Sequence, residues 1–243
     1  MIFAAGLGSR LRPITSNIPK ALVDIGGMTL LQFQLLRFRK SGFNEVIINV
    51  HHQAEKIIRY LREKKDFGMN ITISHEKEGL LDTGGGMKKA SWFFDDGRPF
   101  LAHNVDVVSN MDLNRFMEFH ASRDALATLA VRERESRRYL LFDPDTMTLA
   151  GWRNVATGEE KIPVQVACPK RLAFSGIHIA DPRVFFATDM SGRFSLVDLW
   201  LSLAKDHKIC GYLHNDDLWA DVGTPKKLEY VRDLPDGLLH DMR

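Results

Sequence analysis

The chain has 243 residues, of which 44% are hydrophobic and 26% charged, and its formal net charge is only +2. This composition is typical of a folded protein with a full core, and the small net charge gives no support for nucleic-acid binding by bulk electrostatics. No apolar run approaches the ~20 residues of a membrane span, so no membrane association is expected. The two cysteines, Cys168 and Cys210, lack metal-ligand spacing and suggest no disulfide framework. A reducing, cytoplasmic compartment is therefore predicted.

The first half of the chain alternates between strand-like and helix-like patterns. Apolar runs predict strands at 1–5, 45–50, 71–75, 100–106 and 125–131. Apolar residues at helical spacing, together with stop signals, predict helices at 29–40, 53–65, 86–94 and 113–122. Strands that alternate with helices of about 10–15 residues favour an α/β fold. We therefore expect a Rossmann-like mixed, mainly parallel sheet with helices on both faces.

The second half of the chain is richer in strands. Strands are predicted at 139–142, 149–152, 172–179 and 209–213, a loop at 154–169, and helices at 195–205 and 225–231. No repeat, low-complexity tract or linker divides the chain. The strand-rich part is therefore expected to extend one sheet within a single domain.

A glycine-rich segment with three cations follows the first predicted strand. From Ala5 to Lys20 it reads AGLGSRLRPITSNIPK. Glycines bring backbone N–H groups close to a ligand, and N–H groups combined with Arg and Lys side chains form phosphate sites. The Gly-Lys-Ser/Thr of a Walker loop is absent, and Leu11 stands where the dinucleotide fingerprint needs its third glycine. An ordinary glycine turn with surface arginines is the remaining alternative.

This segment resembles the signature of the sugar-1-phosphate nucleotidylyltransferases, written G-x-G-[ST]-R-L-x-P-x-T…P-K. In that family the loop wraps the triphosphate of the incoming nucleotide. The resemblance implies nucleotide binding by Ala5, Gly6, Gly8 and Ser9. It also implies two catalytic residues, with Arg10 holding phosphate oxygens and Lys20 reaching the phosphates at the reaction centre. Fixed cations and N–H donors suit this chemistry, because phosphoryl-type transfer leaves little covalent work for the protein.

A second glycine run, Leu81-Asp82-Thr83-Gly84-Gly85-Gly86, follows the strand predicted at 71–75. Taken alone, it is also consistent with a glycine-rich helix start. It resembles the base-binding segment of the same family, which implies that Thr83, Gly84 and Gly85 seat the nucleobase. A glutamate or glutamine shortly upstream commonly contributes in that family, and Glu76 or Glu78 is the candidate here.

Two aspartates stand at motif positions far apart in the sequence. Asp106 ends an apolar strand, where α/β sheets bind ligands, and Asp221 opens the motif D-V-G-T-P before the last helix. The aspartates at these positions in the family bind Mg²⁺, so the resemblance implies that Asp106 and Asp221 are metal ligands and that Asp106 is also catalytic. The plain alternatives are a strand-end cap at Asp106 and an N-cap at Thr224. Val105 departs from the family pattern, which usually has glycine there.

A third segment, Phe174-Ser175-Gly176, lies in the strand predicted at 172–179. It resembles the sugar-binding half of the family, which implies substrate contacts from Asn104, Phe174, Ser175 and Gly176. A β-bulge at Gly176 is the alternative. The single domain is then expected to span 1–243, with a nucleotide-binding half at about 1–130 and a sugar-binding half at about 131–243.

The resemblance as a whole implies Mg²⁺-dependent transfer of a nucleotidyl group from a nucleoside triphosphate to a sugar 1-phosphate, giving a nucleotide-sugar and pyrophosphate. N-acetylmuramate-1-phosphate uridylyltransferases and mannose-1-phosphate guanylyltransferases are the types it resembles most, with UTP favoured and cell-wall or surface polysaccharide precursors as the expected products. Two alternatives stay open. One is a cytidylyltransferase for a phospho-alcohol such as phosphocholine, with Trp152 and Trp219 as aromatic candidates. The other is a catalytically silent nucleotide-sugar-binding regulator. A monomer or small homo-oligomer without nucleic-acid partners is expected.

Overall fold

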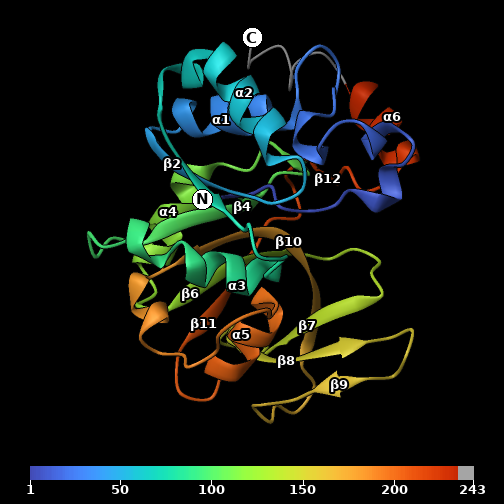
Figure 1. Ribbon diagram of the computed structural model, residues 1–243. Coiled ribbons are helices and arrows are strands. Elements are labelled where there is room, and N and C mark those ends of the chain that lie inside the picture. Colours follow the sequence, from blue (N-terminus) through green and yellow to red (C-terminus); the bar gives the residue numbers. More distant parts are fainter. Residues whose placement is uncertain (235–243) are drawn as a thin grey trace. The chain divides into compact units, whose positions relative to one another are not determined.

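The computed structural model describes residues 1–234 (Figure 1). These residues form two compact units. Unit 1 comprises Met1–Leu80, His103–Met111 and the described residues from Asp217 onward; unit 2 comprises Leu81–Ala102 and Asp112–Asp216. The predicted halves are continuous in sequence, whereas these two units are interleaved. Each unit is described by itself below. Within residues 1–234, no helix is long and apolar enough to cross a membrane.

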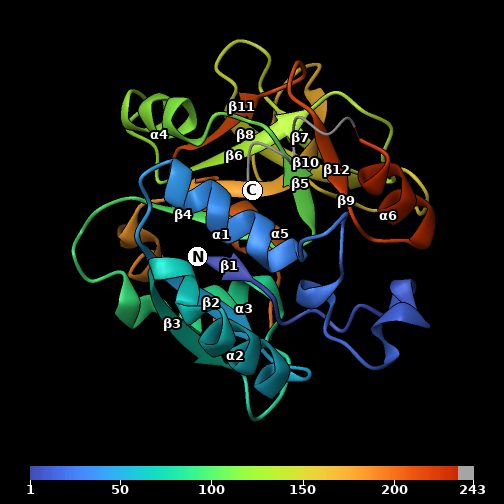
Figure 2. The same ribbon diagram turned by 90° about the horizontal axis from the view of Figure 1, so that it is seen from above.

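Unit 1 is built on a parallel sheet. Its strands are β1 (Ile2–Phe3), β2 (Glu45–Val50), β3 (Asn70–His75) and the last two residues of β4 (Phe100–Asn104). They lie in the order β3-β2-β1-β4, and Figure 2 shows β3, β2 and β1 side by side. Ile2 pairs with Ile48 on one side and with His103 on the other. The predicted parallel core is therefore present.

Two helices connect the parallel strands of unit 1. They are α1 (Leu30–Lys40) and α2 (Ala54–Glu63), and Figure 1 shows both on the same side of β2. Right-handed crossovers that step along a sheet in one direction place consecutive helices on one face. The side chain of Thr29 caps α1 by accepting a hydrogen bond from the Gln32 N–H at 3.0 Å.

A two-stranded ribbon in unit 1 was not predicted. It pairs β5 (Val107–Ser109) with β12 (Trp219–Asp221) in antiparallel register, and α6 (Pro225–Arg232) follows it. The strand predicted at 100–106 ends at Asn104. Asp106 therefore lies in the turn before β5 and not inside a strand. Strands of three residues are too short to show a recognisable alternation of apolar and polar residues. Their stability depends on the partner strand, which the local sequence does not reveal.

Unit 2 carries a mixed sheet. Its strands are β6 (Ala127–Arg132), β7 (Arg138–Phe142), β8 (Leu149–Asn154), β9 (Glu160–Lys161), β10 (Lys170–Ala180) and β11 (Ile209–Leu213). β6 pairs with β11 in parallel and with β10 in antiparallel register, and β10, β7, β8 and β9 follow as antiparallel neighbours. This agrees with the predicted strand-rich second half. The short β9 interrupts the loop predicted at 154–169.

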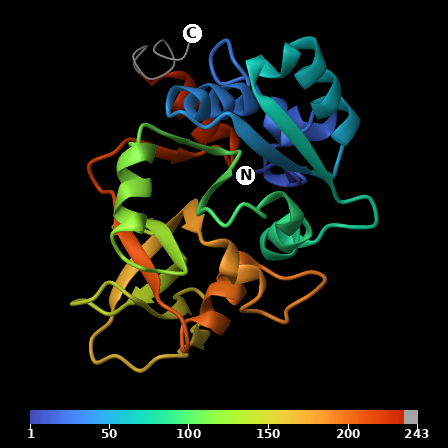
Figure 3. The same ribbon diagram turned by 90° about the vertical axis from the view of Figure 1, so that its left-hand side faces the viewer.

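Three helices belong to unit 2: α3 (Asp82–Lys89), α4 (Leu113–Ala121) and α5 (Leu196–Leu203). Phe116 and Phe119 of α4 pack against Tyr212 of β11, with ring centroids 5.0 and 4.9 Å apart, and α4 lies beside that strand in Figure 3. The prediction placed the start of α3 at Gly86, four residues late. Glycine has low helix propensity, but here the burial of Gly84–Gly86 in tertiary contacts outweighs it.

Candidate active site

The glycine loop leaves β1 and turns back on itself within unit 1. Gly8 has φ +63°, a conformation that favours glycine. Its carbonyl oxygen accepts hydrogen bonds from the Leu11 N–H at 2.9 Å and from the Thr15 hydroxyl at 2.7 Å. A Cβ on Gly8 would lie 3.1 Å from the Thr15 methyl and 3.3 Å from Lys20 Cβ. The second glycine of the motif is therefore required both by its φ angle and by close packing.

Lys20 and Asp106, both predicted as catalytic, lie in direct contact in unit 1. The Lys20 ammonium donates a hydrogen bond to Asp106 Oδ2, and the two side chains are 11% and 22% exposed. Lys20 begins a short 3₁₀ turn, and Asp106 lies in the turn between β4 and β5. An ion pair with so little solvent around it holds both groups in one geometry more firmly than an exposed pair does.

The ribbon brings the two predicted metal carboxylates onto adjoining backbone. Asp221 lies opposite Val107 in the register of β12 with β5. The Val222 N–H donates a hydrogen bond of 2.7 Å to the carbonyl oxygen of Asp106. Two aspartates far apart in the sequence are thus next to each other in the fold, which their predicted shared role requires.

Gly223 lies at the point where Asp221 and Arg10 approach each other. A Cβ on Gly223 would lie 2.7 Å from Asp221 Oδ1 and 3.0 Å from Arg10 Nη2. The guanidinium of the glycine loop therefore lies beside the second carboxylate. Thr224 is the N-cap of α6 as predicted, but its side chain makes no capping hydrogen bond, and the proline at the first helical position contributes to that helix start instead.

Lys227 on α6 contacts one of the predicted metal carboxylates, and it is not among the site residues predicted from the sequence. Its ammonium donates a hydrogen bond to Asp221 Oδ2. One signal in the sequence could have drawn attention to it. A lysine in the first turn of a helix lies where the helix dipole favours anions, so its position calls for another explanation.

The donor set of Asp106 and Asp221 fits Mg²⁺. Mg²⁺ prefers oxygen ligands and usually takes one or two carboxylates together with substrate phosphates. Within residues 1–234, no group of three or more His, Cys, Asp or Glu side chains gathers as a metal cage. Asp106 and Asp221, which are partly exposed and lie on adjoining backbone, thus offer oxygen donors of the kind that Mg²⁺ prefers.

Glu76 and Asn104 occupy the carboxyl ends of parallel strands in unit 1. Glu76 follows β3 and is 1% exposed, and its Oε1 accepts a hydrogen bond of 2.7 Å from the Asn49 side-chain amide. Asn104 ends β4 and lies opposite Phe3 in the parallel ladder. Their positions agree with ligand binding at strand ends, while their individual roles stay predictions.

In unit 2, the predicted base-binding glycines pack closely against a neighbouring segment. The N–H groups of Gly84 and Gly85 donate to the Phe194 carbonyl at 3.0 and 3.2 Å. A Cβ on Gly84 would lie 2.5 Å from the Phe194 ring, and one on Gly85 would lie 2.2 Å from the Gly192 carbonyl oxygen. Thr83 Oγ1 accepts a hydrogen bond from the Leu196 N–H at 3.1 Å. Packing alone thus explains these residue types, and their role in nucleotide binding stays a prediction.

The predicted sugar-binding segment lies at an irregularity within strand β10. The register against β6 shifts between Phe174 and His178, and Gly176 has φ +76°, so the bulge considered above is present. Ser175 is fully buried, and its hydroxyl lies 2.7 Å from Nε2 of His214. Arg134 donates a hydrogen bond of 3.2 Å to the Phe174 carbonyl. This part of β10 is therefore held by side chains from outside the strand.

The buried His214 predicts a pH-dependent stability. Desolvation, and to a lesser extent the charge of Arg132, lower the pKa of His214 from 6.5 to about 4. The unfolded chain therefore binds more protons between these values, and stability falls as the pH drops from about 6.5 to 4, by on the order of 3 kcal/mol. Urea unfolding at pH 7, 6 and 5 should show this fall, and His214→Gln should reduce it, with a remainder from His120 and His178, whose pKa values burial also lowers. Parallel curves for the two proteins would contradict the prediction.

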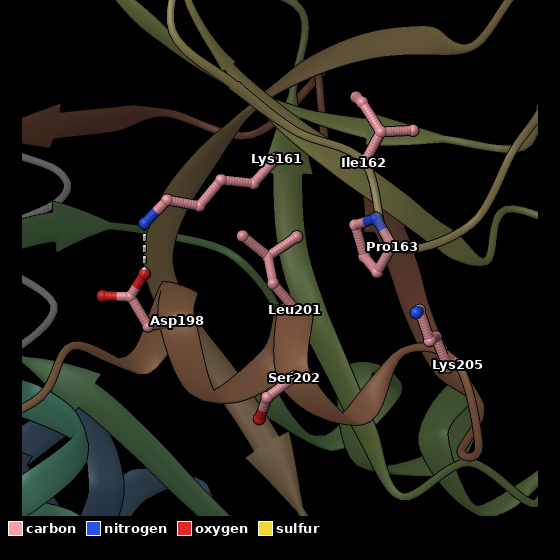
Figure 4. Close-up of a pocket in the computed structure, with 7 residues that line it drawn as sticks. All are labelled: Lys161, Ile162, Pro163, Asp198, Leu201, Ser202 and Lys205. Carbon is pink, nitrogen blue, oxygen red and sulfur yellow. Dashed lines mark hydrogen bonds and ion pairs between the residues drawn. The ribbon is translucent and has the colours of Figure 1, made fainter.

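A separate pocket of about 470 Å³ lies in unit 2, and none of the predicted site residues lines it. Its lining residues are Lys161, Ile162, Pro163, Asp198, Leu201, Ser202 and Lys205 (Figure 4). Lys161 donates a hydrogen bond of 2.7 Å to Asp198, and its ammonium lies 5.7 Å from the ring centroid of Trp152. Trp152, a candidate for binding the quaternary ammonium of phosphocholine, thus has the Lys161 ammonium near its ring.

Residues 1–233 match the sequence model of the family described as nucleotidyl transferase. The chain belongs to this family. It is 32% identical over 235 residues to the N-acetylmuramate alpha-1-phosphate uridylyltransferase of Caulobacter vibrioides, which covers 93% of this chain and 92% of the relative. It is 30% identical over 234 residues to the enzyme of the same name from Neisseria meningitidis serogroup B, covering 96% of each.

The fold of this nucleotidyl transferase is similar to that of a solved structure. The solved structure of UDP-glucose pyrophosphorylase complexed with UDP-glucose superposes with a TM-score of 0.75 at 17% identity, covering 100% of this chain and 98% of the other. The predicted mixed α/β fold with a parallel core is confirmed. The predicted family and enzyme class, a sugar-1-phosphate nucleotidylyltransferase, are confirmed as well.

Proposed function

We propose that this enzyme transfers the uridylyl group of UTP to N-acetylmuramate 1-phosphate in a Mg²⁺-dependent reaction. The products are the UDP-sugar and pyrophosphate, which would make the enzyme a cytoplasmic supplier of cell-wall precursors. The choice of base and sugar is supported by the two uridylyltransferases of that name, which are 32% and 30% identical over nearly their whole length.

One observation carries the proposed chemistry. Unit 1 forms two ion pairs, Lys20 with Asp106 and Lys227 with Asp221, and Arg10 approaches Asp221 at Gly223. Carboxylates of this kind hold Mg²⁺, and cations of this kind hold phosphates. A nucleoside triphosphate with its bound metal is a ligand that needs carboxylates and cations at the same place.

The proposed reaction is an in-line displacement at the α-phosphorus of the nucleotide. A phosphate oxygen of the sugar 1-phosphate forms the new P–O bond, the bond to the bridging oxygen of the β-phosphate breaks, and its electron pair leaves with pyrophosphate. No general base is needed, because the attacking oxygen is already anionic at neutral pH. When bound to Asp106 and Asp221, Mg²⁺ would neutralise charge on phosphate oxygens.

The side chains around the carboxylates have separate tasks in this proposal. Arg10 and the N–H groups of the glycine loop bind the phosphates of the nucleotide and stabilise charge on the leaving pyrophosphate. Lys20, held in place by Asp106, orients the phosphates at the reacting phosphorus. Both tasks depend on fixed positions, since preorganised donors need no rearrangement as the charge develops.

The substrate assignment is tested with a matrix of nucleotides and phosphorylated acceptors. We expect pyrophosphate release with UTP and N-acetylmuramate 1-phosphate to exceed release with GTP and mannose 1-phosphate, or with CTP and phosphocholine, by at least about tenfold in kcat/KM. A preference for either of the other pairs would contradict the choice of substrate. Nucleotide-sugar binding without pyrophosphate release from any pair would favour the silent regulator instead.

A further inference from the structure

We propose that Lys227 is a movable counter-ion of Asp221. In the substrate-free enzyme its ammonium occupies one carboxylate oxygen, and when the metal and nucleotide bind it transfers to a phosphate oxygen of the nucleotide. This inference rests on the proposed function, because it takes Asp221 as a metal ligand. It adds a phosphate-binding residue that the glycine loop and its signature do not include.

The contacts of Asp221 place a different cation near each of its oxygens. Oδ2 accepts the hydrogen bond of Lys227, whereas Oδ1 lies on the side of Gly223, where Arg10 approaches. With a cation near each oxygen of Asp221, a metal ion that binds either oxygen meets a competing positive charge. One of these cations must therefore give way when a metal binds, and Lys227 is the one in direct contact.

Lys227 is well suited to leaving, and Lys20 is not. The Lys227 side chain is 48% exposed, while the Lys20 side chain is 11% exposed. An exposed ion pair contributes little to stability because water solvates both partners, so breaking the Lys227 pair has a small cost. A largely buried ammonium that loses its carboxylate has no comparable replacement in water.

The location of Lys227 also argues against a structural role in its own helix. It lies in the first turn of α6, where the helix dipole favours anions and disfavours cations. Its neighbour Lys226 is equally placed and exposed. Helix stability thus gives no reason for a cation at either position, whereas the pair with Asp221 gives one at Lys227.

The charge balance of the cluster points to an anionic ligand. Asp106 and Asp221 carry two negative charges, while Arg10, Lys20 and Lys227 carry three positive charges, which leaves one positive charge in excess. Once a metal takes over the carboxylate, the released ammonium lies beside phosphate oxygens, which are strong acceptors for charge-assisted hydrogen bonds.

Removal of Lys227 should therefore have effects of opposite sign on metal and on nucleotide. The test compares Lys227→Met with Lys226→Met as the control, using Mn²⁺ as the probe in calorimetry on the substrate-free enzyme. We expect Lys227→Met to bind Mn²⁺ about threefold to fivefold more tightly, because a competitor is gone. We expect its KM for UTP to rise about tenfold, because a phosphate contact is lost. The control should change neither quantity.

Two further variants separate this inference from the proposed function. Lys227→Arg keeps the charge, so its KM for UTP should be close to the wild-type value and well below that of Lys227→Met. Asp221→Asn should lose Mn²⁺ binding; if it binds Mn²⁺ like the wild type, the metal assignment of the proposed function fails. If Asp221→Asn loses Mn²⁺ while Lys227→Met leaves both Mn²⁺ affinity and the KM unchanged, or weakens Mn²⁺ binding, the inference about Lys227 alone is overturned.

Discussion

Replacing Asp106 with asparagine is expected to lower kcat by about 10²- to 10⁴-fold while leaving the protein folded. The amide has nearly the same shape, and its oxygen still accepts a hydrogen bond from Lys20, so the local geometry has little reason to collapse. The negative charge is lost, and with it a ligand that a hard cation such as Mg²⁺ requires. The effect should therefore appear in turnover and in the Mg²⁺ dependence, and the largely buried Lys20, left without its counter-charge, should also lower the melting temperature.

The measurement compares the steady-state rate over a range of Mg²⁺ concentrations with the melting temperature of the same preparation. Asp95→Asn is a matched control, because Asp95 is exposed and the substitution removes the same charge. We expect the control to keep wild-type rates. An Asp106→Asn enzyme with full turnover and an unchanged Mg²⁺ dependence would remove Asp106 from the metal site.

Gly223→Ala is expected to lower kcat/KM by about 10²-fold, even though the position is only a glycine. The added Cβ would lie 2.7 Å from Asp221 Oδ1 and 3.0 Å from Arg10 Nη2, closer than these atoms tolerate. Both clashing atoms are the ends of side chains and not backbone, so the fold can relieve the clash by moving them. The enzyme should therefore keep its stability and lose the arrangement of its carboxylate and guanidinium.

A double-mutant cycle sharpens the Gly223 prediction. If the added methyl acts by displacing Arg10, then Gly223→Ala should cost much less in an Arg10→Ala background than in the wild type. Gly158→Ala is a control for activity only, because the residue lies in unit 2 and its surroundings are open, while its φ of +75° predicts some loss of stability. Full additivity in the cycle would show that the methyl acts without Arg10, and an unchanged rate for Gly223→Ala would contradict the packing argument.

Long elements with a regular apolar pattern were predictable from the chain alone. The strand predicted at 45–50 is β2, and the helix predicted at 29–40 is α1 with Thr29 as its cap. Their signals are local, since each buried face recurs at the period of its own secondary structure. The glycine loop was equally recognisable, because its residue types stand at fixed offsets and need no distant partner to be noticed.

Short elements and long-range contacts were not predictable in this way. The ribbon of β5 and β12 joins segments more than a hundred residues apart, and each strand has only three residues. The start of α3 was misplaced because burial outweighs the low helix propensity of its glycines. In the same way, the pairing of Lys227 with Asp221 depends on how α6 follows the ribbon, and the sequence contains no pattern for that contact.

Spacing and residue type were thus sufficient to predict the parallel α/β core, and the resemblance of the motifs was sufficient for the family, while Arg10, Lys20, Asp106 and Asp221 stay predicted site residues. The tertiary structure was needed to show that Asp106 and Asp221 lie on adjoining backbone, that Lys20 holds the first carboxylate, and that Lys227 holds the second. The physical reason is one of range. Periodicity and turn chemistry act over a few residues, whereas an ion pair or a shared metal site depends on distances that only the folded chain determines.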